Sequence, residues 1–158
     1  MTSKPDNTMQ PSDMLKLDQQ LCFAIYAASK EVTKLYRPML EKLELTYPQY
    51  ITLLALWEQD NVTVKELGQQ LFLDSGTLTP MLKRMEQQQL IERKRGAQDE
   101  RHVFITLTNK GRDLKSAASC IPAELVSKAA GADIPVDSLM RNLQELTAYL
   151  QSINHTGE

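Results

Sequence analysis

Residues 61–107 constrain the possible folds of this 158-residue chain more than any other stretch. A capping box over Thr63–Glu66 predicts the start of a short helix, about residues 64–71, because its two side chains satisfy free N–H groups at the helix end. A turn over residues 73–76 follows, and a second amphipathic helix comes after it. The apolar stripe of that second helix consists of Leu78, Met81, Leu82 and Met85.

The start of the second helix has two interpretations. Pro80 has no N–H, so it fits most easily into a first turn that Thr77 caps. The alternative is a start at Asp74 with a slight kink at Pro80. The sequence leaves both open.

Two short segments of alternating apolar and polar residues come next, residues 90–95 and 101–107. Residues 96–100 are rich in turn formers and join them into a hairpin, to which Val62 adds a small strand. A helix, a turn, a helix and a hairpin predict a mainly α fold with a small β wing, the winged helix-turn-helix. In that fold one helix fits the major groove of DNA and the hairpin reaches the neighbouring minor groove.

The expected DNA-contacting residues are polar or charged and lie on the second helix and the hairpin. They are Ser75, Thr77, Thr79, Lys83, Arg84, Arg93, Arg95, Asp99 and Arg101. Plain helix capping accounts for at least one of the three hydroxyl residues. An ion pair between Asp99 and Arg101 would stiffen the hairpin tip and aim an arginine into a narrow minor groove. As an exposed pair alone it would contribute only about 0–1 kcal/mol.

The charge of the chain limits the kind of nucleic-acid binding to expect. The formal net charge is −2 and the pI about 5.7, which argues against a general polyanion binder or a DNA-packing protein. Residues 83–101 nevertheless hold six basic and four acidic residues, a local excess of two positive charges. A dimer would double this patch, so we expect sequence-specific binding of a homodimer to a pseudo-palindromic operator in double-stranded DNA.

Helices are also expected on both sides of this region. One runs from about residue 13 to 43, with Pro38 as a possible bend, and Thr46 with Pro48 starts another. A third follows Thr108 and reaches about residue 121, and the last spans about residues 135–153 with apolar residues at three-four spacing. We expect the first helix and the two C-terminal helices to form a dimer interface.

The remaining composition excludes several classes of protein. No apolar run is long enough to cross a bilayer, and the polar N-terminus has no secretory signal. We therefore expect a cytoplasmic protein that does not associate with a membrane. Cys22 and Cys120 lie far apart and do not have metal-site spacing, so we expect neither a metal nor a cofactor. No constellation of catalytic residues stands out, and we do not expect an enzyme.

Two segments resemble a known family. The stretch DSGTLTPMLKRMEQQ, followed by RKR and DER, resembles the MarR family of winged-helix repressors. The stretch LCFAIYAASKEVTKLYRPMLEKLELTYPQY resembles the branch of that family that senses organic hydroperoxides. Together they cover most of residues 14–121. One departure is Gln89, which stands where the family usually has a glycine, so it would have to adopt a left-handed conformation.

The resemblance implies a dimeric repressor with a reactive cysteine that accepts hydrogen bonds from tyrosines. By position the cysteine is Cys22 and the tyrosines are Tyr36 and Tyr47, with Tyr26 nearby. A subgroup forms an intersubunit disulfide with a second cysteine, for which Cys120 stands here. The implied function is a repressor that an organic hydroperoxide releases from DNA by oxidising Cys22.

Helix geometry adds a condition to this expectation. Tyr36 follows Cys22 by fourteen positions, about 21 Å along an unbroken helix. The two side chains therefore meet only across a dimer, unless the helix breaks sharply. Two other interpretations stay open: a repressor that a small aromatic ligand releases, with incidental cysteines, and a thiol peroxidase. Taken alone, Cys22 would be an inert small apolar residue.

These expectations divide the chain into four parts. Residues 1–12 form a flexible tail, and residues 13–46 form the N-terminal helix with dimerisation and sensing roles. Residues 47–107 form the DNA-binding winged helix-turn-helix. Residues 108–158 form C-terminal dimerisation helices.

Overall fold

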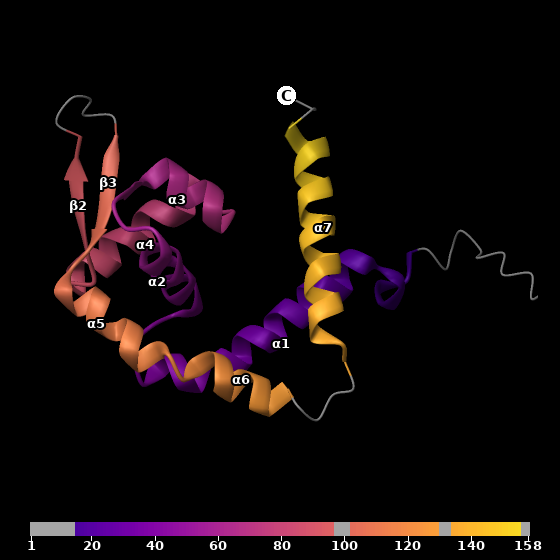
Figure 1. Cartoon of the computed structure of the whole chain (residues 1–158). Helices are drawn as coiled ribbons and strands as arrows, with labels where there is room; N and C mark the ends of the chain where they lie inside the picture. The colour runs from indigo at the N-terminus through magenta and orange to yellow at the C-terminus, as the bar shows by residue number, and fades with distance from the viewer. Residues whose placement is uncertain (1–14, 97–101, 130–133, 156–158) are drawn as a thin grey trace, which may run out of the picture. The chain divides into compact units, whose positions relative to one another are not determined.

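The computed structural model describes residues 15–96, 102–129 and 134–155. The chain divides into two compact units, Met1–Ile121 and Pro122–Glu158, each described here by itself. The first unit holds a winged helix-turn-helix, so the predicted mainly α fold with a small β wing is confirmed (Figure 1). Within the described ranges no helix combines the length and apolar character needed to cross a membrane.

Helix α1 spans Leu21–Glu41 and begins later than the predicted residue 13. A 3-10 turn at Leu17–Gln19 precedes it, and the extended backbone of Gln20 (φ −90°, ψ 115°) separates the two. Pro38 lies inside α1.

Helix α2 spans Tyr47–Glu58 and starts where the sequence predicts. The Thr46 N–H donates to Gln49 Oε1 over 2.9 Å, which satisfies one free donor at the helix end. Leu53 and Leu56 are buried in the core, whereas Leu54 lies on the opposite face of the helix and is 39% exposed.

Strand β1 (Val62–Thr63) leads directly into α3 (Val64–Leu71). The predicted capping box is present, since the Glu66 N–H donates to Thr63 Oγ1 and the Thr63 N–H donates to Glu66 Oε2. Gly68 lets the following turn approach closely: a Cβ there would lie 2.9 Å from the Leu73 carbonyl oxygen. The turn and α3 are therefore packed tightly together.

Helix α4 spans Ser75–Gln87, which decides between the two predicted starts. Asp74 is the cap, and its Oδ1 accepts from the Thr77 N–H over 2.9 Å. Pro80 thus lies inside the helix, not in its first turn. An aspartate beside free helix N–H groups explains this outcome, because it caps better than threonine and its charge suits the helix N-terminus.

The α4 helix ends in a Schellman motif centred on Gln89. The Leu90 N–H bonds to the Met85 carbonyl and the Gln89 N–H to the Glu86 carbonyl, each over 2.9 Å. Gln89 has φ 60°, so its predicted left-handed conformation is confirmed. The turn that usually takes glycine is formed here at some cost in backbone strain.

The wing is a three-stranded antiparallel sheet in the order β1-β3-β2. Strand β2 spans Ile91–Arg95 and β3 spans Val103–Leu107, with Ile105 opposite both Val62 and Arg93. Ile105 and Leu107 are buried, as the alternation predicts, and they pack the sheet onto the helical core. The predicted hairpin tip lies mostly outside the described residues.

The C-terminal part differs from the prediction at one point. Helix α5 spans Asn109–Ala118 and stops before residue 121; Ser119–Cys120 form a turn, and a separate helix, α6, spans Ile121–Ala129. Pro122 sits as the second residue of α6, a position that needs no N–H partner, so it fits the start of a new helix there. Helix α7 spans Val136–His155, as predicted.

Candidate DNA interface and cysteine–tyrosine site

The N-terminal half of α4 carries the hydroxyl residues expected to meet DNA. Thr77 is engaged in capping, because its N–H and Oγ1 donate to the two carboxylate oxygens of Asp74, each over 2.9 Å. These hydrogen bonds lower the pKa of Asp74, the backbone one most. Ser75 is exposed and Thr79 half-buried on the same turns. Thr77 therefore stabilises the N-terminal end of α4, where Ser75 and Thr79 also lie.

The basic residues of the expected interface divide into two groups. Lys83 and Arg84 on α4 and Arg95 at the end of β2 are exposed. Arg93 is instead held against α4: its N–H donates to Glu86 Oε1 over 3.2 Å, and its Nη1 lies 3.9 Å from Glu86 Oε2. Arg93 Nε is buried and has no hydrogen-bond partner among the described residues. Arg93 thus joins the wing to α4.

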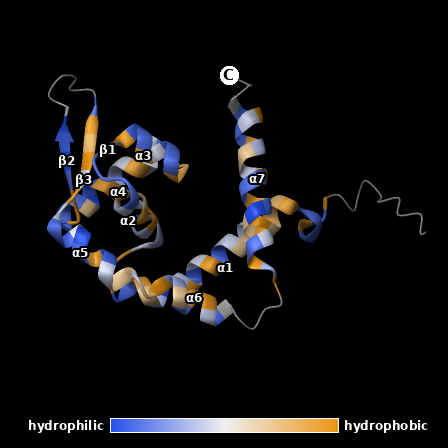
Figure 2. Cartoon of the chain, viewed as in Figure 1, coloured by the Kyte–Doolittle hydropathy of each residue, from blue (hydrophilic) through white to orange (hydrophobic). Residues whose placement is uncertain are grey.

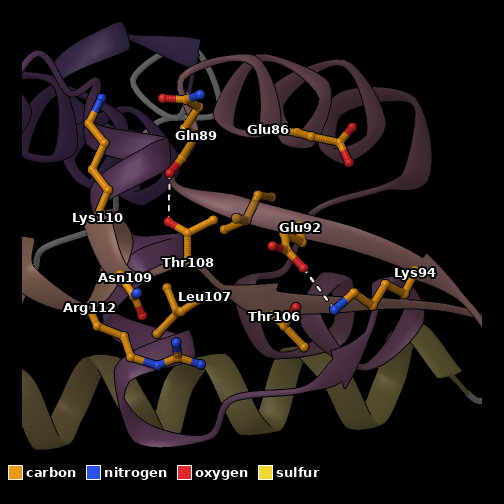
Figure 3. Close-up of a pocket in the computed structure, with 11 residues that line it drawn as sticks. Glu86, Gln89, Glu92, Lys94, Thr106, Leu107, Thr108, Asn109, Lys110 and Arg112 are labelled. Atoms are coloured by element: carbon orange, nitrogen blue, oxygen red, sulfur yellow. Dashed lines mark hydrogen bonds and ion pairs between the residues drawn. The ribbon is translucent and has the colours of Figure 1, made fainter.

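Asp99 and Arg101, the expected pair at the wing tip, lie outside the described residues. At the base of the wing, Figure 3 shows an open pocket between the end of α4, the sheet and the start of α5. Glu92 and Lys94 form an ion pair there over 2.8 Å, which lowers the pKa of Glu92. Thr108 Oγ1 donates to the Gln89 carbonyl over 2.6 Å. The Thr108 bond joins the end of α4 to the start of α5, whereas the Glu92–Lys94 pair lies within β2.

Three tyrosines gather where α1 meets the first turn of α2. The ring centroids of Tyr36 and Tyr47 lie 5.1 Å apart, and those of Tyr36 and Tyr50 lie 5.8 Å apart. Burial raises the pKa of Tyr36 above 10.0, and the neighbouring Tyr47 and Tyr50 raise it further. Burial, Tyr47 and Cys120 raise the pKa of Tyr50. Tyr36 and Tyr50 therefore stay protonated at neutral pH and can donate hydrogen bonds.

Tyr50 was missed in the sequence reasoning. It is 3% exposed, and its place three positions after Tyr47 puts both rings on one face of α2. That spacing was the available signal. The structure therefore brings Tyr36 and Tyr47 together, and it adds a third phenol, Tyr50.

The two cysteines occupy different places relative to this cluster. Cys120 lies in the turn after α5, within electrostatic reach of Tyr50, and its Sγ donates to the Ala117 carbonyl over 3.5 Å. Cys22 is the second residue of α1, fourteen positions before Tyr36 in an unbroken helix, which places the two about 21 Å apart along the axis. Both thiols are free and exposed. One protomer therefore does not bring Cys22 to Tyr36 or Tyr47.

Tyr26 lies one helical turn after Cys22. Its ring centroid is 6.3 Å from that of Phe23, and Lys30 Nζ lies 5.5 Å from the Tyr26 centroid. This end of α1 is exposed: Tyr26 shows 57% of its surface. Of the three predicted tyrosines, Tyr26 is the one that lies at the Cys22 end of α1.

Helices α1 and α7 each carry hydrophobic residues along their length (Figure 2), and many of these side chains are exposed. On α1 they are Leu21, Phe23, Ile25, Val32 and Leu35, and on α7 they are Val136, Leu139, Met140, Leu143, Leu150 and Ile153. Repeated apolar residues at helical spacing outside a core are typical of a surface that another chain covers. Among the described residues no group of histidine, cysteine or carboxylate side chains has the arrangement of a metal site.

Known proteins are similar to this chain in sequence and in fold. The family model of the transcriptional regulators SarA/Rot matches residues 34–118. An organic hydroperoxide resistance transcriptional regulator from Bacillus subtilis (strain 168) is 58% identical over 124 residues, 77% of this chain and 84% of the relative.

Solved structures of AbfR from Staphylococcus epidermidis have the same fold. Reduced AbfR bound to DNA is 34% identical, with a TM-score of 0.73 over 90% of this chain and 96% of AbfR. Disulfide-formed AbfR has a TM-score of 0.59 at 34% identity, over 88% of this chain and 95% of that one.

Proposed function

This chain belongs to the MarR family of winged-helix transcriptional regulators, in the organic hydroperoxide resistance branch, and on that premise we propose that it is a homodimeric repressor that oxidation of Cys22 releases from operator DNA. AbfR, a relative with the same fold, has been solved bound to DNA in reduced form and also in a disulfide-formed state. The inducer is an organic hydroperoxide, and the protein acts in the cytoplasm. It is a regulator and not an enzyme.

One observation carries the redox part of the proposal: the phenol cluster and Cys120 lie at one end of α1, and Cys22 lies at the other. Tyr36 and Tyr47 pack together beside Tyr50, whose pKa is raised mainly by burial and also by the nearby Tyr47 and Cys120. A second protomer with its α1 antiparallel would bring its Cys22 to this cluster. The exposed apolar residues of α1 and α7 provide the surface for that dimer.

The chemistry follows from the surroundings that the dimer would give Cys22. The thiolate is the nucleophile, and an isolated thiol with a pKa of about 8.5 is mostly protonated at neutral pH. Hydrogen bonds from protonated phenols favour the thiolate. It attacks the outer oxygen of the hydroperoxide, the O–O bond breaks, and the products are the Cys22 sulfenic acid and the alcohol. The partner's thiol at Cys120 then displaces water to form the disulfide.

The disulfide changes the protein because its geometry is narrow. Its two Cα atoms must come within about 4.4–6.8 Å of each other. The turn at Cys120 moves toward Cys22 of the other protomer, and the dimer helices carry this movement to the DNA-binding regions. In the reduced dimer the two α4 helices bind half-sites about 34 Å apart, so a change in their spacing weakens binding.

The same residues that were predicted from sequence serve as the DNA interface in this proposal. Ser75, Thr79, Lys83, Arg84 and Arg95 contact the operator, as do Asp99 and Arg101 at the wing tip. Thr77 and Arg93 support these contacts, through Asp74 and Glu86 respectively. The four-part division of the chain, with dimerisation at both ends of the DNA-binding region, is part of the same proposal.

The test is release of the reduced protein–operator complex by cumene hydroperoxide, followed by fluorescence anisotropy. Wild type dissociates, whereas Cys22→Ser stays bound. Non-reducing gels and intact masses show a disulfide-linked dimer in wild type but not in Cys120→Ser. Cumyl alcohol, which has the same aromatic group without the peroxide, leaves all three proteins bound. Release by cumyl alcohol, or release of Cys22→Ser, would contradict the proposal and favour a ligand-released repressor.

A further inference from the structure

A pair of side-chain amides, one of them buried, joins the tyrosine cluster to the end of the recognition helix α4. Gln49 lies in the first turn of α2, between Tyr47 and Tyr50, and is 5% exposed. Its Nε2 donates to Oε1 of Gln88 over 2.8 Å, across 39 positions of the chain. Gln88 is the C-cap of α4. This hydrogen bond therefore joins two helices that the sequence separates by α3 and the turn.

Each of the two side-chain amides also makes one further hydrogen bond to the backbone. Gln49 Oε1 accepts from the Thr46 N–H over 2.9 Å, and Gln88 Nε2 donates to the Glu44 carbonyl over 3.4 Å. The backbone carbonyl of Gln88 also accepts from Lys110 Nζ over 2.9 Å. A buried amide is costly unless it is hydrogen-bonded, and two engaged amides hold one relative position of the helices. The α1–α2 connection and the α4 end are thus fixed to each other through this pair.

We propose that the Gln49–Gln88 pair is the positioning contact through which the cysteine–tyrosine site controls α4. The inference rests on the proposed function, because it needs a redox change at that site. Gln49 shares a helical turn with Tyr47 and Tyr50, so a shift of that turn when Cys120 is drawn into a disulfide moves the Gln49 amide. The bond is short and directional, and the movement reaches Gln88 directly.

The position of Gln88 gives the movement its effect on DNA. Helix α4 has 13 residues, a length of about 20 Å, and Gln88 follows its last residue. Ser75 and Thr79 lie at the opposite end. A displacement at Gln88 therefore tilts or slides the end that meets the operator. Among the described residues, the other side-chain hydrogen bonds between α2 and a neighbouring helix involve Trp57: its Nε1 donates to the Gly111 carbonyl and its carbonyl accepts from Lys115 Nζ. These bonds hold α2 to α5 instead.

The experiment compares operator affinity in two redox states. The dissociation constant is measured by anisotropy for reduced protein and for protein converted to the disulfide. The ratio of the disulfide value to the reduced value reports the coupling between the site and DNA binding. Gln49→Leu and Gln88→Ala should each lower this ratio at least about tenfold. The double variant should lower it no further than either single change, since both remove the same bond. Disulfide formation on non-reducing gels should proceed as in wild type.

Thr52→Val is the matched control. Thr52 is fully buried and its Oγ1 donates to the Pro48 carbonyl over 2.8 Å, a hydrogen bond that stays within α2. The Thr52→Val change should destabilise the protein and leave the ratio of dissociation constants unchanged. Gln88 is half-buried, so Gln88→Ala keeps the test available if Gln49→Leu does not fold.

The outcomes separate this inference from the proposed function. A wild-type ratio near one overturns both. A large wild-type ratio that Gln88→Ala retains, with normal disulfide formation, overturns the inference alone and leaves the amide pair as a purely structural contact. An equal loss in Thr52→Val would also overturn it, because any destabilisation of α2 would then have the same effect.

Discussion

Tyr36 and Tyr47 hold their ring centroids 5.1 Å apart although they come from different helices. Tyr36 lies near the C-terminal end of α1, and Tyr47 is the first residue of α2. This places the phenols of one protomer far from its own Cys22, at the opposite end of α1. The sensor that we propose is therefore assembled from two chains.

The hydroxyl group of Tyr47 should control how fast Cys22 is oxidised. Tyr47→Phe keeps the ring that packs on Tyr36 but removes the donor. A hydrogen bond to a charged group contributes about 1.5–3 kcal/mol, so the rate constant with cumene hydroperoxide should fall about tenfold or more. Trapping of the sulfenic acid followed by mass spectrometry measures that rate. Tyr149→Phe, at an exposed position on α7, is the control and should react at the wild-type rate.

The strained residue after α4 offers a stability test. Gln89 has φ 60°, where a side chain costs about 1 kcal/mol and glycine costs little. Gln89→Gly should therefore raise the free energy of unfolding by about 1 kcal/mol in urea titrations. Gln87 lies two positions earlier and is the last residue of α4. Gln87→Gly should lower the free energy of unfolding by about 0.5–1 kcal/mol. Changes of the same sign in both variants would contradict this explanation.

Asp60 should make the free energy of unfolding depend on pH in the acidic range. Burial by itself would raise its pKa, but hydrogen bonds from the Leu107 N–H, Arg112 and the Asn61 N–H outweigh burial and lower the pKa below 3.8. A lowered folded-state pKa means that the carboxylate stabilises the protein above about pH 4. This contribution disappears as the pH falls through the folded-state pKa.

Urea titrations of Asp60→Asn at pH 7 and pH 3 test this dependence. The variant should lose about 1 kcal/mol at pH 7, a value reduced because the side chain is partly exposed. Its difference from wild type should shrink at pH 3. Asp18→Asn, at an exposed position before α1, should stay within about 0.5 kcal/mol of wild type at pH 7. A difference in Asp60→Asn that grows in acid would be the opposite of what the hydrogen bonds require.

Much of the winged region could be predicted because its signals are local. The capping box of Thr63 and Glu66 sets the start of α3, and alternation of apolar residues predicts the burial of Ile105 and Leu107. The left-handed turn at Gln89 follows from its place after a helix. The cap and the turn depend on contacts between neighbours in sequence, and the alternating burial follows from the period of two residues in a strand.

The features that escaped prediction depend on contacts between distant segments or on a choice between neighbouring signals. Asp74 and Thr77 were both plausible caps for α4, and the sequence did not show which carboxylate or hydroxyl would face the free N–H groups. Pro122 can end one helix or begin the next, and here it begins α6. The pairing of Gln49 with Gln88 is visible only once α2 and α4 are packed together.

The most direct test of the two-chain sensor uses a mixed dimer of Cys22→Ser and Cys120→Ser protomers, one of them carrying an affinity tag. Neither chain alone holds both cysteines, but the mixed dimer holds one Cys22 and one Cys120 on opposite chains. After cumene hydroperoxide, we predict a disulfide-linked dimer on non-reducing gels that contains one tagged and one untagged chain. If the mixed protein stays monomeric on those gels while wild type forms a disulfide within one chain, the account is wrong.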